Sequence, residues 1–345
     1  MAERWKNRPD GSNWGEFGAD DQLGRLNLLT KEKVLQGVAE VKEGRAFVLS
    51  LPLDRPGRSP HPARHPPRLA ATIRHGQAGY NLSLSAVDPD FYDIVSDDVA
   101  LIHTQFSTQW DSFAHWGARF DADADGTAEP VYYNGWRAGP DIKGPRKDDP
   151  AKGWERFPGV SAQALGIEKM AETGVQGRGV MIDLRRHVGD GRTMIGYDGL
   201  MRVMDKDKIG VEPGDMVCLH TGFADRILEM GANTDVDGLH HLCAVLDGRD
   251  ARLLKWISDS QLSTLIADNY AVEAYPAGPG MGPRAALPLH EHCLFKLGVH
   301  LGEIWHLTKL AEWLRAAGRA RFLLTAPPLR LPGAVGSPAT PVATV

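Results

Sequence analysis

Residues 102–116, IHTQFSTQWDSFAHW, alternate between two kinds of side chain and predict a strand with two unlike faces. One face would pack into a core and carries Ile102, Thr104, Phe106, Thr108 and Trp110. The other face is polar and carries His103, Gln105, Ser107, Gln109 and Asp111, and is followed by His115. Because this polar face contains no Lys, Arg or Glu, it indicates the lining of a cavity. A half-buried surface strand is the alternative that the pattern alone leaves open.

Length and composition describe an enzyme-sized globular chain. Its 345 residues can bury a large core, and hydrophobic residues make up 42% and charged residues 24%. A net charge of −5 gives no reason to expect nucleic acid as a partner. No secretion signal and no apolar run long enough for a membrane span is found, so we expect a cytoplasmic protein. The three cysteines lie among apolar residues, which is typical of buried reduced thiols.

Short β-branched runs alternate with amphipathic stretches, which predicts a mixed α/β (α+β) fold with a single domain over residues 1–345. Helices are expected over residues 31–44 and 286–298, and strands over 46–53, 177–184, 215–223 and 299–307. We also expect an N-terminal extension of about residues 1–60 and two insertions. The insertion at about residues 55–85 is rich in Pro and Arg and is expected to form a long surface excursion, and the insertion at about 120–165 is rich in turn-forming residues.

The segment DADADG, residues 121–126, copies the first half of an EF-hand calcium loop. The twelfth position of such a loop needs a bidentate Glu, and here it is Tyr132. Calcium is therefore not expected at this loop.

A second group of candidate metal ligands lies in residues 289–305, LHEHCLFKLGVHLGEIW. His290 and His292 fall near the start of the expected helix, and Glu303 falls on the strand that follows Gly298. A hairpin-like return at Gly298 would bring His290 and Glu303 together. Glu303 has apolar neighbours, and an isolated carboxylate is unfavourable there unless it is paired or bound to a metal. A salt bridge between His290 and Glu303 is the alternative.

Two segments, STQWDSFAHW and LHEHCLFKLGVHLGEIWHL, stand out together with WGEFGADDQLGRLNLLT, GRGVMIDLRRHVG, VEPGDMVCLHTGF, ADNYAVEAYP and PPLRLPGAVGSPATPVA. As a set that spans nearly the whole chain, they resemble the cyclase family of metal-dependent hydrolases, which includes kynurenine formamidase, isatin hydrolase and trans-dienelactone hydrolase. The resemblance implies the swivelling β/β/α fold of that family, a small-molecule substrate, and a homodimer or higher homo-oligomer.

The family's first motif reads HxGTHxDxPxH, in which both early histidines and the Asp bind metal and the last His transfers protons. By this resemblance, Asp111 matches the Asp and His115 matches the last His. Gln105 and Gln109, however, stand where the two ligand histidines are expected, and Phe113 replaces the motif's Pro. The chain therefore departs from the family pattern at the first metal site.

In binuclear relatives the Asp bridges to a second metal held by a later His and Glu, which the resemblance places at His290 and Glu303. A neutral carboxamide is a poorer ligand than imidazole, so the two glutamines predict loss of the first site. The expected cofactor is one divalent ion, Zn²⁺ or Mn²⁺, held by Asp111, His290 and Glu303. Further ligands or substrate contacts could come from His103, Gln105 and His292.

We expect a metal-dependent hydrolase of an amide, lactone or related acyl bond in a small cyclic or aromatic carbonyl compound. His115 would carry the proton to the leaving group, and Gln109 or the metal would stabilise the oxyanion. An aromatic wall for the substrate would come from Trp110, Phe113 and Trp116. Two alternatives stay open: a metal-free protein that binds a small molecule, and a cyclase or lyase that uses His115 as a base.

Overall fold

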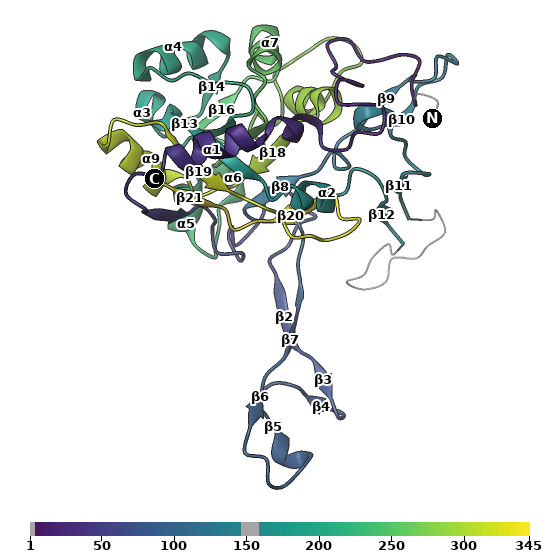
Figure 1. The fold of residues 1–345 in the computed structure, drawn as a ribbon, viewed down its shortest axis with the longest axis vertical. Coiled ribbons are helices and arrows are strands. Elements are labelled where there is room, and N and C mark those ends of the chain that lie inside the picture. The colour runs from purple at the N-terminus through teal and green to yellow at the C-terminus, as the bar shows by residue number, and fades with distance from the viewer. Residues whose placement is uncertain (1–3, 146–158) are drawn as a thin grey trace.

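A nine-stranded mixed sheet runs through the centre of the body (Figure 1). The structure is a computed structural model that describes residues 4–145 and 159–345. From edge to edge, the strands are β1 (Ala46–Val48), β21 (Val342–Thr344), β19 (Arg321–Thr325), β13 (Gln176–Asp183), β15 (Met216–His220), β17 (Thr264–Ala267), β18 (His300–Glu303), β8 (Gln109–Asp111) and β20 (Gly336–Pro338). The four strands from β13 to β18 pair in parallel, and antiparallel pairs flank them on both sides. The expected mixed α/β single domain is confirmed.

Helical crossovers connect the parallel strands, because parallel neighbours cannot be joined by a tight turn. They are α3 (Leu184–Val188) and α4 (Tyr197–Asp207) after β13; α5 (Phe223–Met230), α6 (Val236–Leu239) and α7 (Ala251–Ser260) after β15; and α8 (Pro288–His290) with the π-helical segment η4 (Glu291–Leu297) after β17. The remaining helices are η1 (Gly24–Leu28), α1 (Lys31–Ala39), α2 (Ile167–Glu172), η3 (Tyr133–Gly135) and α9 (Thr308–Ala316). Among the described residues, no helix is long and apolar enough to cross a bilayer.

Both faces of the sheet are buried, and each has its own core. In β15, Val217 and Leu219 point into the core that contains residues of α4 and α7. Met216 and Cys218 alternate with them and point into the opposite core, which contains residues of α2 and α9. The continuous apolar runs of the central strands follow from this double burial. The side chains of the candidate site lie on the α4 and α7 side of the sheet.

Three short ribbons lie outside the central sheet: β9 (Ala118–Phe120) with β10 (Glu129–Val131), β11 (Ile142–Lys143) with β12 (Ser161–Ala162), and β14 (Thr193–Ile195) with β16 (Ala244–Leu246). The first two fall in the segment expected as an insertion at about residues 120–165. Residues 146–158 of that segment lie outside the described part of the chain.

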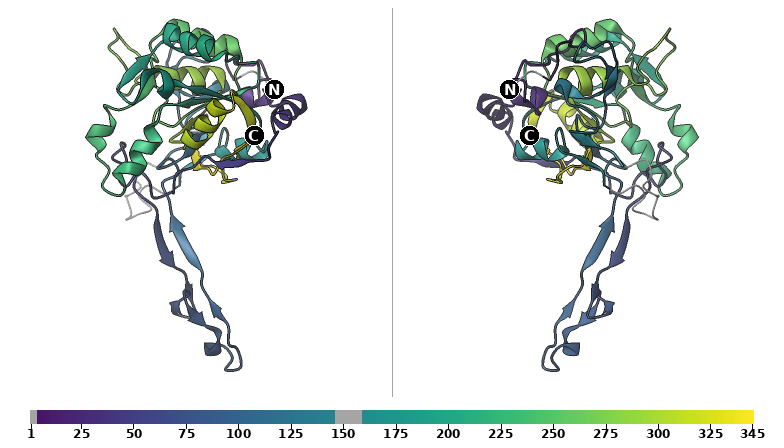
Figure 2. Two further views of the ribbon diagram at one scale, coloured as in Figure 1. Left: turned by 90° about the vertical axis from the view of Figure 1, so that its left-hand side faces the viewer. Right: turned by 90° about the vertical axis from the view of Figure 1, so that its right-hand side faces the viewer.

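A long ribbon, here called the arm and comprising residues 68–101, projects away from the body (Figures 1 and 2). It contains β2 (Arg68–Ala71) paired with β7 (Asp98–Leu101), β3 (Ile73–Arg74) with β4 (Gln77–Ala78), β5 (Leu82–Ser83) with β6 (Ile94–Val95), and the turn η2 (Leu84–Ala86). The surface excursion expected at about residues 55–85 thus covers only the first half of the arm. Residues 59–62 and Arg64, before the arm, line a cavity of the body.

The expected elements form, but several are shorter than their sequence patterns. The helix expected over residues 286–298 ends at Gly298, whose φ of +59° is the left-handed conformation that glycine adopts easily. The strand expected over residues 102–116 is wrong in length, because only β8 is strand. The backbone N–H of Phe106 donates to the carbonyl of His103 at 3.1 Å and closes a turn just before β8. The sheet partners of β8, which are β18 and β20, each pair with three of its residues.

Candidate metal and substrate site

Two neighbouring strands place three polar side chains on one face of the sheet. β8 and β18 are antiparallel, with Asp111 opposite Leu301 and Gln109 opposite Glu303. Residues directly opposite one another in a ladder share a face, so Gln109, Asp111 and Glu303 point to the same side. Trp110 lies between them in sequence and points to the other side. The alternation expected from the sequence therefore holds across these three residues.

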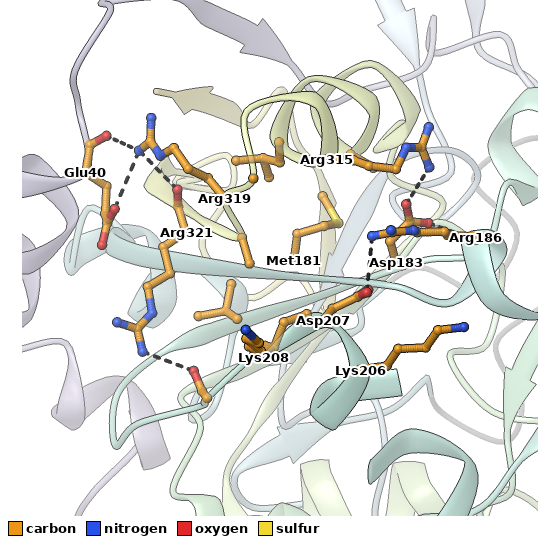
Figure 3. Close-up of a pocket in the computed structure, with 17 residues that line it drawn as sticks. Glu40, Met181, Asp183, Arg186, Lys206, Asp207, Lys208, Arg315, Arg319 and Arg321 are labelled. Carbon is orange, nitrogen blue, oxygen red and sulfur yellow. Dashed lines mark hydrogen bonds and ion pairs between the residues drawn. The ribbon is translucent and has the colours of Figure 1, made fainter. Parts of the chain in front are cut away.

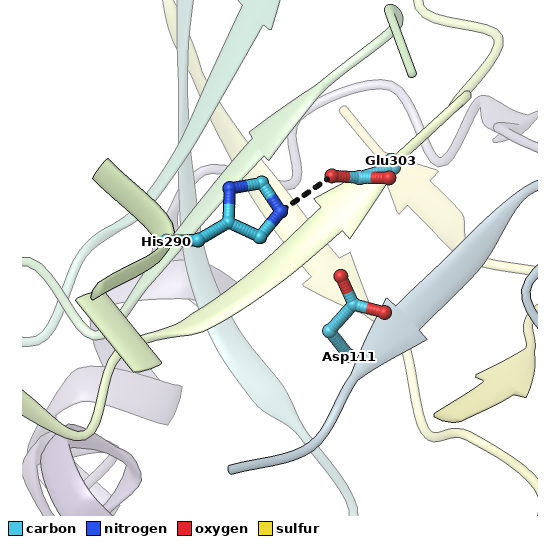
Figure 4. A group of neighbouring side chains, drawn as sticks. All are labelled: Asp111, His290 and Glu303. Carbon is cyan, nitrogen blue, oxygen red and sulfur yellow. Dashed lines mark ion pairs between the residues drawn. The ribbon is translucent and has the colours of Figure 1, made fainter. Parts of the chain in front are cut away.

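His290 reaches this face from α8 and is oriented by Glu273. One carboxylate oxygen of Glu273 accepts hydrogen bonds from the backbone N–H and from Nδ1 of His290, both at 2.9 Å. The other oxygen accepts from the backbone N–H of Leu289 at 3.0 Å. With Nδ1 donating to Glu273, Nε2 faces Glu303 Oε1 at 3.3 Å (Figure 4). A carboxylate that fixes one ring nitrogen in this way is the usual support of a metal-binding histidine.

The side chains of Asp111, His290 and Glu303 form a compact buried group with the donor set of a divalent ion. Their ligand atoms lie within 4.8 Å of one another (Figure 4), and none of the three residues is more than 3% exposed. Asp111 Oδ2 is buried and has no hydrogen-bond partner among the described residues, which is unfavourable for a carboxylate oxygen. One imidazole and two carboxylates suit Zn²⁺ or Mn²⁺. The residues present therefore fit a single divalent ion.

Burial and crowding of charge shift the protonation of this group. Burial and the nearby charge of Asp111 together raise the pKa of Glu303 to about 7. Burial alone would lower the pKa of His290, but hydrogen bonds with Glu273 and Glu303 raise it to about 10. The positive charge of protonated His290 thus compensates the negative charge of the carboxylates. A bound cation would compensate this charge instead and would displace the proton from Nε2.

Gln105 and Gln109, which stand where the resemblance places two ligand histidines, are hydrogen-bonded to the carboxylates. Gln105 Nε2 donates to Asp111 Oδ1. Gln109 Nε2 donates to Glu303 Oε2 at 3.2 Å and lies 3.4 Å from Asp111 Oδ1. Gln105 lines the cavity described next, whereas Gln109 is fully buried and is not part of the cavity wall. Gln109 therefore positions the carboxylates, and its expected contact with an oxyanion is not available in this structure.

A cavity of about 410 Å³ gives access to the group, and His290 and Glu303 are part of its wall. His115 and Trp116 also line it, and the Trp116 ring centre lies 5.3 Å from that of His290 and 6.0 Å from that of His115. Further wall residues include His61, Arg64, Tyr270 and Tyr275. The structure thus brings two of the three expected ligands, the expected proton carrier and one expected aromatic residue to the wall of one cavity, and Asp111 lies next to the two ligands without lining it.

His115 lies in the turn that follows β8, where its backbone N–H donates to the carbonyl of Ser112 at 3.0 Å. Burial lowers the pKa of His115 below the ordinary histidine value. The charge of Asp111 opposes this shift, and the charges of Arg64 and His290 add to it. His115 is therefore neutral near pH 7 and can accept a proton.

Two of the expected histidines lie outside the cavity. His103 is at the root of the arm, where its Nδ1 lies 3.3 Å from the backbone nitrogen of His65 and 3.1 Å from its carbonyl oxygen. His292 Nε2 lies 2.9 Å from Ser258 Oγ, and burial lowers the pKa of His292 to about 4. His290 and His292 are two positions apart, which is roughly 200° around a helix, so His290 faces the site and His292 faces away from it.

Two of the expected aromatic residues also lie outside the cavity. Trp110 is fully buried, packs edge-on against Trp305 with ring centres 5.0 Å apart, and donates to the carbonyl of Ala326. Phe113 is fully buried and stacks on His300 with ring centres 3.9 Å apart. Both support the strands from the core, so Trp116 alone of the three expected aromatic residues can contact a substrate.

Sequence reasoning missed Glu273 and Arg64. Glu273 lies in the motif ADNYAVEAYP, but only the fold shows that its carboxylate reaches His290, seventeen positions away. Arg64 belongs to the Pro- and Arg-rich segment that was expected at the surface. It lines the cavity and donates to the carbonyl of Gln105 at 2.9 Å.

Two other clusters of charged side chains are engaged in hydrogen bonds and ion pairs of their own. Carboxylate atoms of Asp121, Asp123 and Asp125 come within 4.8 Å of one another, but Asp121 accepts the backbone N–H groups of its own loop. A cavity of about 640 Å³ between α4 and α9 is rich in charged side chains (Figure 3). Most of them form ion pairs that involve Arg186 with Asp207, Arg315 with Asp183 and Arg319 with Glu40.

Comparisons with known proteins place the chain in a family. A family model described as Putative cyclase matches residues 49–301. A crystal structure described as a novel cyclase is 31% identical, covers 97% of each chain and has a TM-score of 0.72. Isatin hydrolase A from Ralstonia solanacearum is 17% identical, with 87% of this chain and 91% of that chain covered and a TM-score of 0.51.

Isatin hydrolase A from Labrenzia aggregata, bound to benzyl benzoate, is 14% identical, with 90% of this chain and 97% of that chain covered and a TM-score of 0.54. At these identities the isatin hydrolases show the fold alone. A search of curated proteins returned no match. The family model and the 31% identical structure both extend over most of the chain, so the protein belongs to the cyclase family.

Proposed function

We propose that the protein is a hydrolase that cleaves an amide, lactone or related acyl bond in a small cyclic or aromatic carbonyl compound, with one divalent ion as cofactor. The observation that carries this proposal is the buried group of Asp111, His290 and Glu303, of which His290 and Glu303 line the same cavity as a neutral His115. Family membership supports it, because structural neighbours include proteins named isatin hydrolase.

Asp111, His290 and Glu303 would hold the ion, either Zn²⁺ or Mn²⁺. When bound, such an ion supplies Lewis-acid polarisation of a carbonyl and lowers the pKa of a water molecule. Glu273 keeps the His290 ring in place through its hydrogen bond to Nδ1. Gln105 and Gln109 hold the two carboxylates through their Nε2 groups, which limits rearrangement of the site when the substrate enters.

His115 would carry the proton. A neutral imidazole can accept a proton during attack on the carbonyl and can pass it to the leaving nitrogen or oxygen. The low pKa of His115, which results from burial, keeps it in this receptive form at neutral pH.

The wall of the cavity favours a flat substrate. Trp116 lies beside both His115 and His290, and Tyr270 and Tyr275 add aromatic surface. Aromatic faces bind rings well through their area and their quadrupoles. Arg64 supplies a positive charge at the same wall, which suits a substrate or product that carries a carboxylate.

Activity assays on metal-loaded protein test this function. The panel would contain aryl formamides, cyclic imides, lactones, peptides and phosphate esters, with Asp111→Asn as the inactive control. We expect turnover of a cyclic or aryl-substituted amide or lactone. Activity confined to peptides or phosphate esters would contradict the proposal.

A metal-free function is the second candidate, and one observation favours it. Gln105 and Gln109 already donate hydrogen bonds to both carboxylates, and His290 lies between Glu273 and Glu303. Such a site could bind a small molecule without catalysis, or it could support a cyclase or lyase reaction with His115 as base. Metal content separates the binding protein from the hydrolase. Incorporation of ¹⁸O from labelled water into the product separates hydrolysis from a lyase reaction.

A further inference from the structure

The cavity between α4 and α9 gathers positive charge (Figure 3). Its volume is about 640 Å³, and six of the described residues that line it are cationic, whereas three are acidic. The chain as a whole has a net charge of −5, so this positive excess is local. Like charges around a cavity repel one another unless an anion lies between them. The cationic residues are Arg186, Lys206, Lys208, Arg315, Arg319 and Arg321.

Several of these cations have no carboxylate to themselves. Glu212 pairs with Arg321 at 3.0 Å and also with Arg178 at 2.7 Å, so one carboxylate serves two guanidinium groups. Lys206 and Lys208 are exposed, and neither ammonium group forms an ion pair with another described residue (Figure 3). An anion in the cavity would therefore meet two ammonium groups that no carboxylate neutralises.

Lys208 has a backbone conformation that is unfavourable for lysine. It caps the C-terminus of α4 in the left-handed region, with φ of +56° and ψ of +43°. Glycine is the usual residue at this position of a helix, because a Cβ atom is disfavoured there. Here the position carries a lysine, and that lysine lines the cavity. A residue held in a disfavoured conformation beside a cavity is typical of a ligand-binding position.

We propose that this cavity binds a small organic phosphate. Guanidinium groups bind phosphate oxygens through paired hydrogen bonds, and ammonium groups add compact positive charges, so four arginines and two lysines suit a group with several phosphate oxygens. The cavity has room for more than a bare phosphate ion, and the apolar side chains of Met181 and Leu314 in its wall can contact an organic part. The site is separate from the candidate metal site, because no described residue lines both this cavity and that of His290 and Glu303.

Isothermal titration calorimetry on the metal-loaded full chain tests the proposal. The probes are inorganic pyrophosphate and citrate, which carry similar charge on phosphate and on carboxylate oxygens. Salt at about 150 mM screens nonspecific attraction between exposed charges. We expect pyrophosphate to bind with a Kd below roughly 1 mM and citrate to bind at least about 10-fold more weakly.

A charge-matched pair of variants locates the binding. Lys206→Gln with Lys208→Gly removes two charges that form no ion pair with other described residues, and glycine suits the left-handed position, so the fold should be retained. This cavity variant should bind pyrophosphate about 10-fold or more weakly. Lys31→Gln with Lys309→Gln removes the same charge from α1 and α9 outside the cavity and should bind as the unchanged chain does. Asp111→Asn, which should lack the metal ion, should also bind pyrophosphate normally.

Four results would overturn the proposal. The first is no binding of pyrophosphate at about 10 mM, and the second is equal affinity in the cavity variant and the unchanged chain. The third is an equal loss in the control variant, which would make the attraction a property of the net charge. The fourth is loss of binding in Asp111→Asn, which would place pyrophosphate at the metal ion. Citrate that binds as tightly as pyrophosphate would overturn the assignment to phosphate.

Discussion

Trp110 and Asp111 are consecutive residues that end on opposite faces of the same strand. The Asp111 carboxylate joins the candidate metal ligands, and the Trp110 ring joins the core on the other side of the sheet. Trp116, in the turn region after β8, lies beside the cavity instead. Replacing Trp110 with alanine should therefore affect mainly the stability of the protein, and replacing Trp116 should affect mainly substrate binding.

Trp110→Ala should reduce the free energy of unfolding by about 3–5 kcal/mol, because it leaves a large hole in a packed core. Trp116→Ala should change stability much less and should raise KM for an aromatic substrate. Chemical denaturation followed by steady-state kinetics measures both effects. Equal losses of stability in the two variants would show that Trp116 is a core residue.

Replacing His115 should lower the rate of the reaction without removing the metal. His115→Ala should keep the metal and its thermal stability and lose about 100-fold or more in kcat, the usual size of an acid–base contribution. In the unchanged enzyme, activity should fall on acidification as His115 becomes protonated. Because burial lowers the pKa of His115, this acidic limb should lie below the ordinary histidine value. Metal loss in His115→Ala would make it a ligand instead.

At the scale of elements, the site depends on α8 and on the loop that carries Glu273. That carboxylate accepts three hydrogen bonds, two of them from backbone N–H groups at the start of α8 and one from His290 Nδ1. Glu273→Gln leaves one oxygen to accept them and places an NH₂ group against a donor. We expect metal affinity to fall by about 10–100-fold, the usual effect of losing such a partner.

Competition with a metal-sensitive dye measures this change. His292→Ala is the matched control, because His292 lies on the same helical segment but contacts Ser258 and not the site. Unchanged metal affinity in Glu273→Gln would show that His290 needs no such support.

Gln109 is the first residue of the short strand β8, and Gln105 lies four positions before it. Replacing these two glutamines tests how many metal ions the site binds. Gln105 donates to Asp111, and Gln109 donates to Glu303 and lies within hydrogen-bonding distance of Asp111. Gln105→His together with Gln109→His replaces the two donors with metal ligands. The double variant should bind a second divalent ion, which titration calorimetry with Zn²⁺ would detect. Each single variant serves as a control and should stay at one ion.

The elements that sequence patterns predicted well are those defined locally. The end of the helix at Gly298 and the buried strands β13 and β15 follow from glycine geometry and from apolar runs. The length of β8 could not be predicted, because it is set by how many residues β18 and β20 pair with it. Glu273 was missed for the same reason, since its contact with His290 depends on tertiary structure.

At the scale of the whole molecule, the arm shows where sequence reasoning is weakest. Its first half was expected as a surface excursion because of its Pro and Arg content. The pairing of β2 with β7 across the ribbon, which extends it to Leu101, depends on a ladder between segments far apart in the sequence. The exposed apolar residues of the arm are recognisable as unusual only when the ribbon is seen to leave the body (Figure 2).

The metal content of the purified protein tests the central claim most directly. After reconstitution with Zn²⁺ or Mn²⁺ and removal of loose ions, elemental analysis should give about one tightly bound ion per chain. Asp111→Asn and His290→Ala should each reduce that value to near zero while the fold is retained. No bound ion after reconstitution, or two in the unchanged protein, would contradict the single-metal site of Asp111, His290 and Glu303.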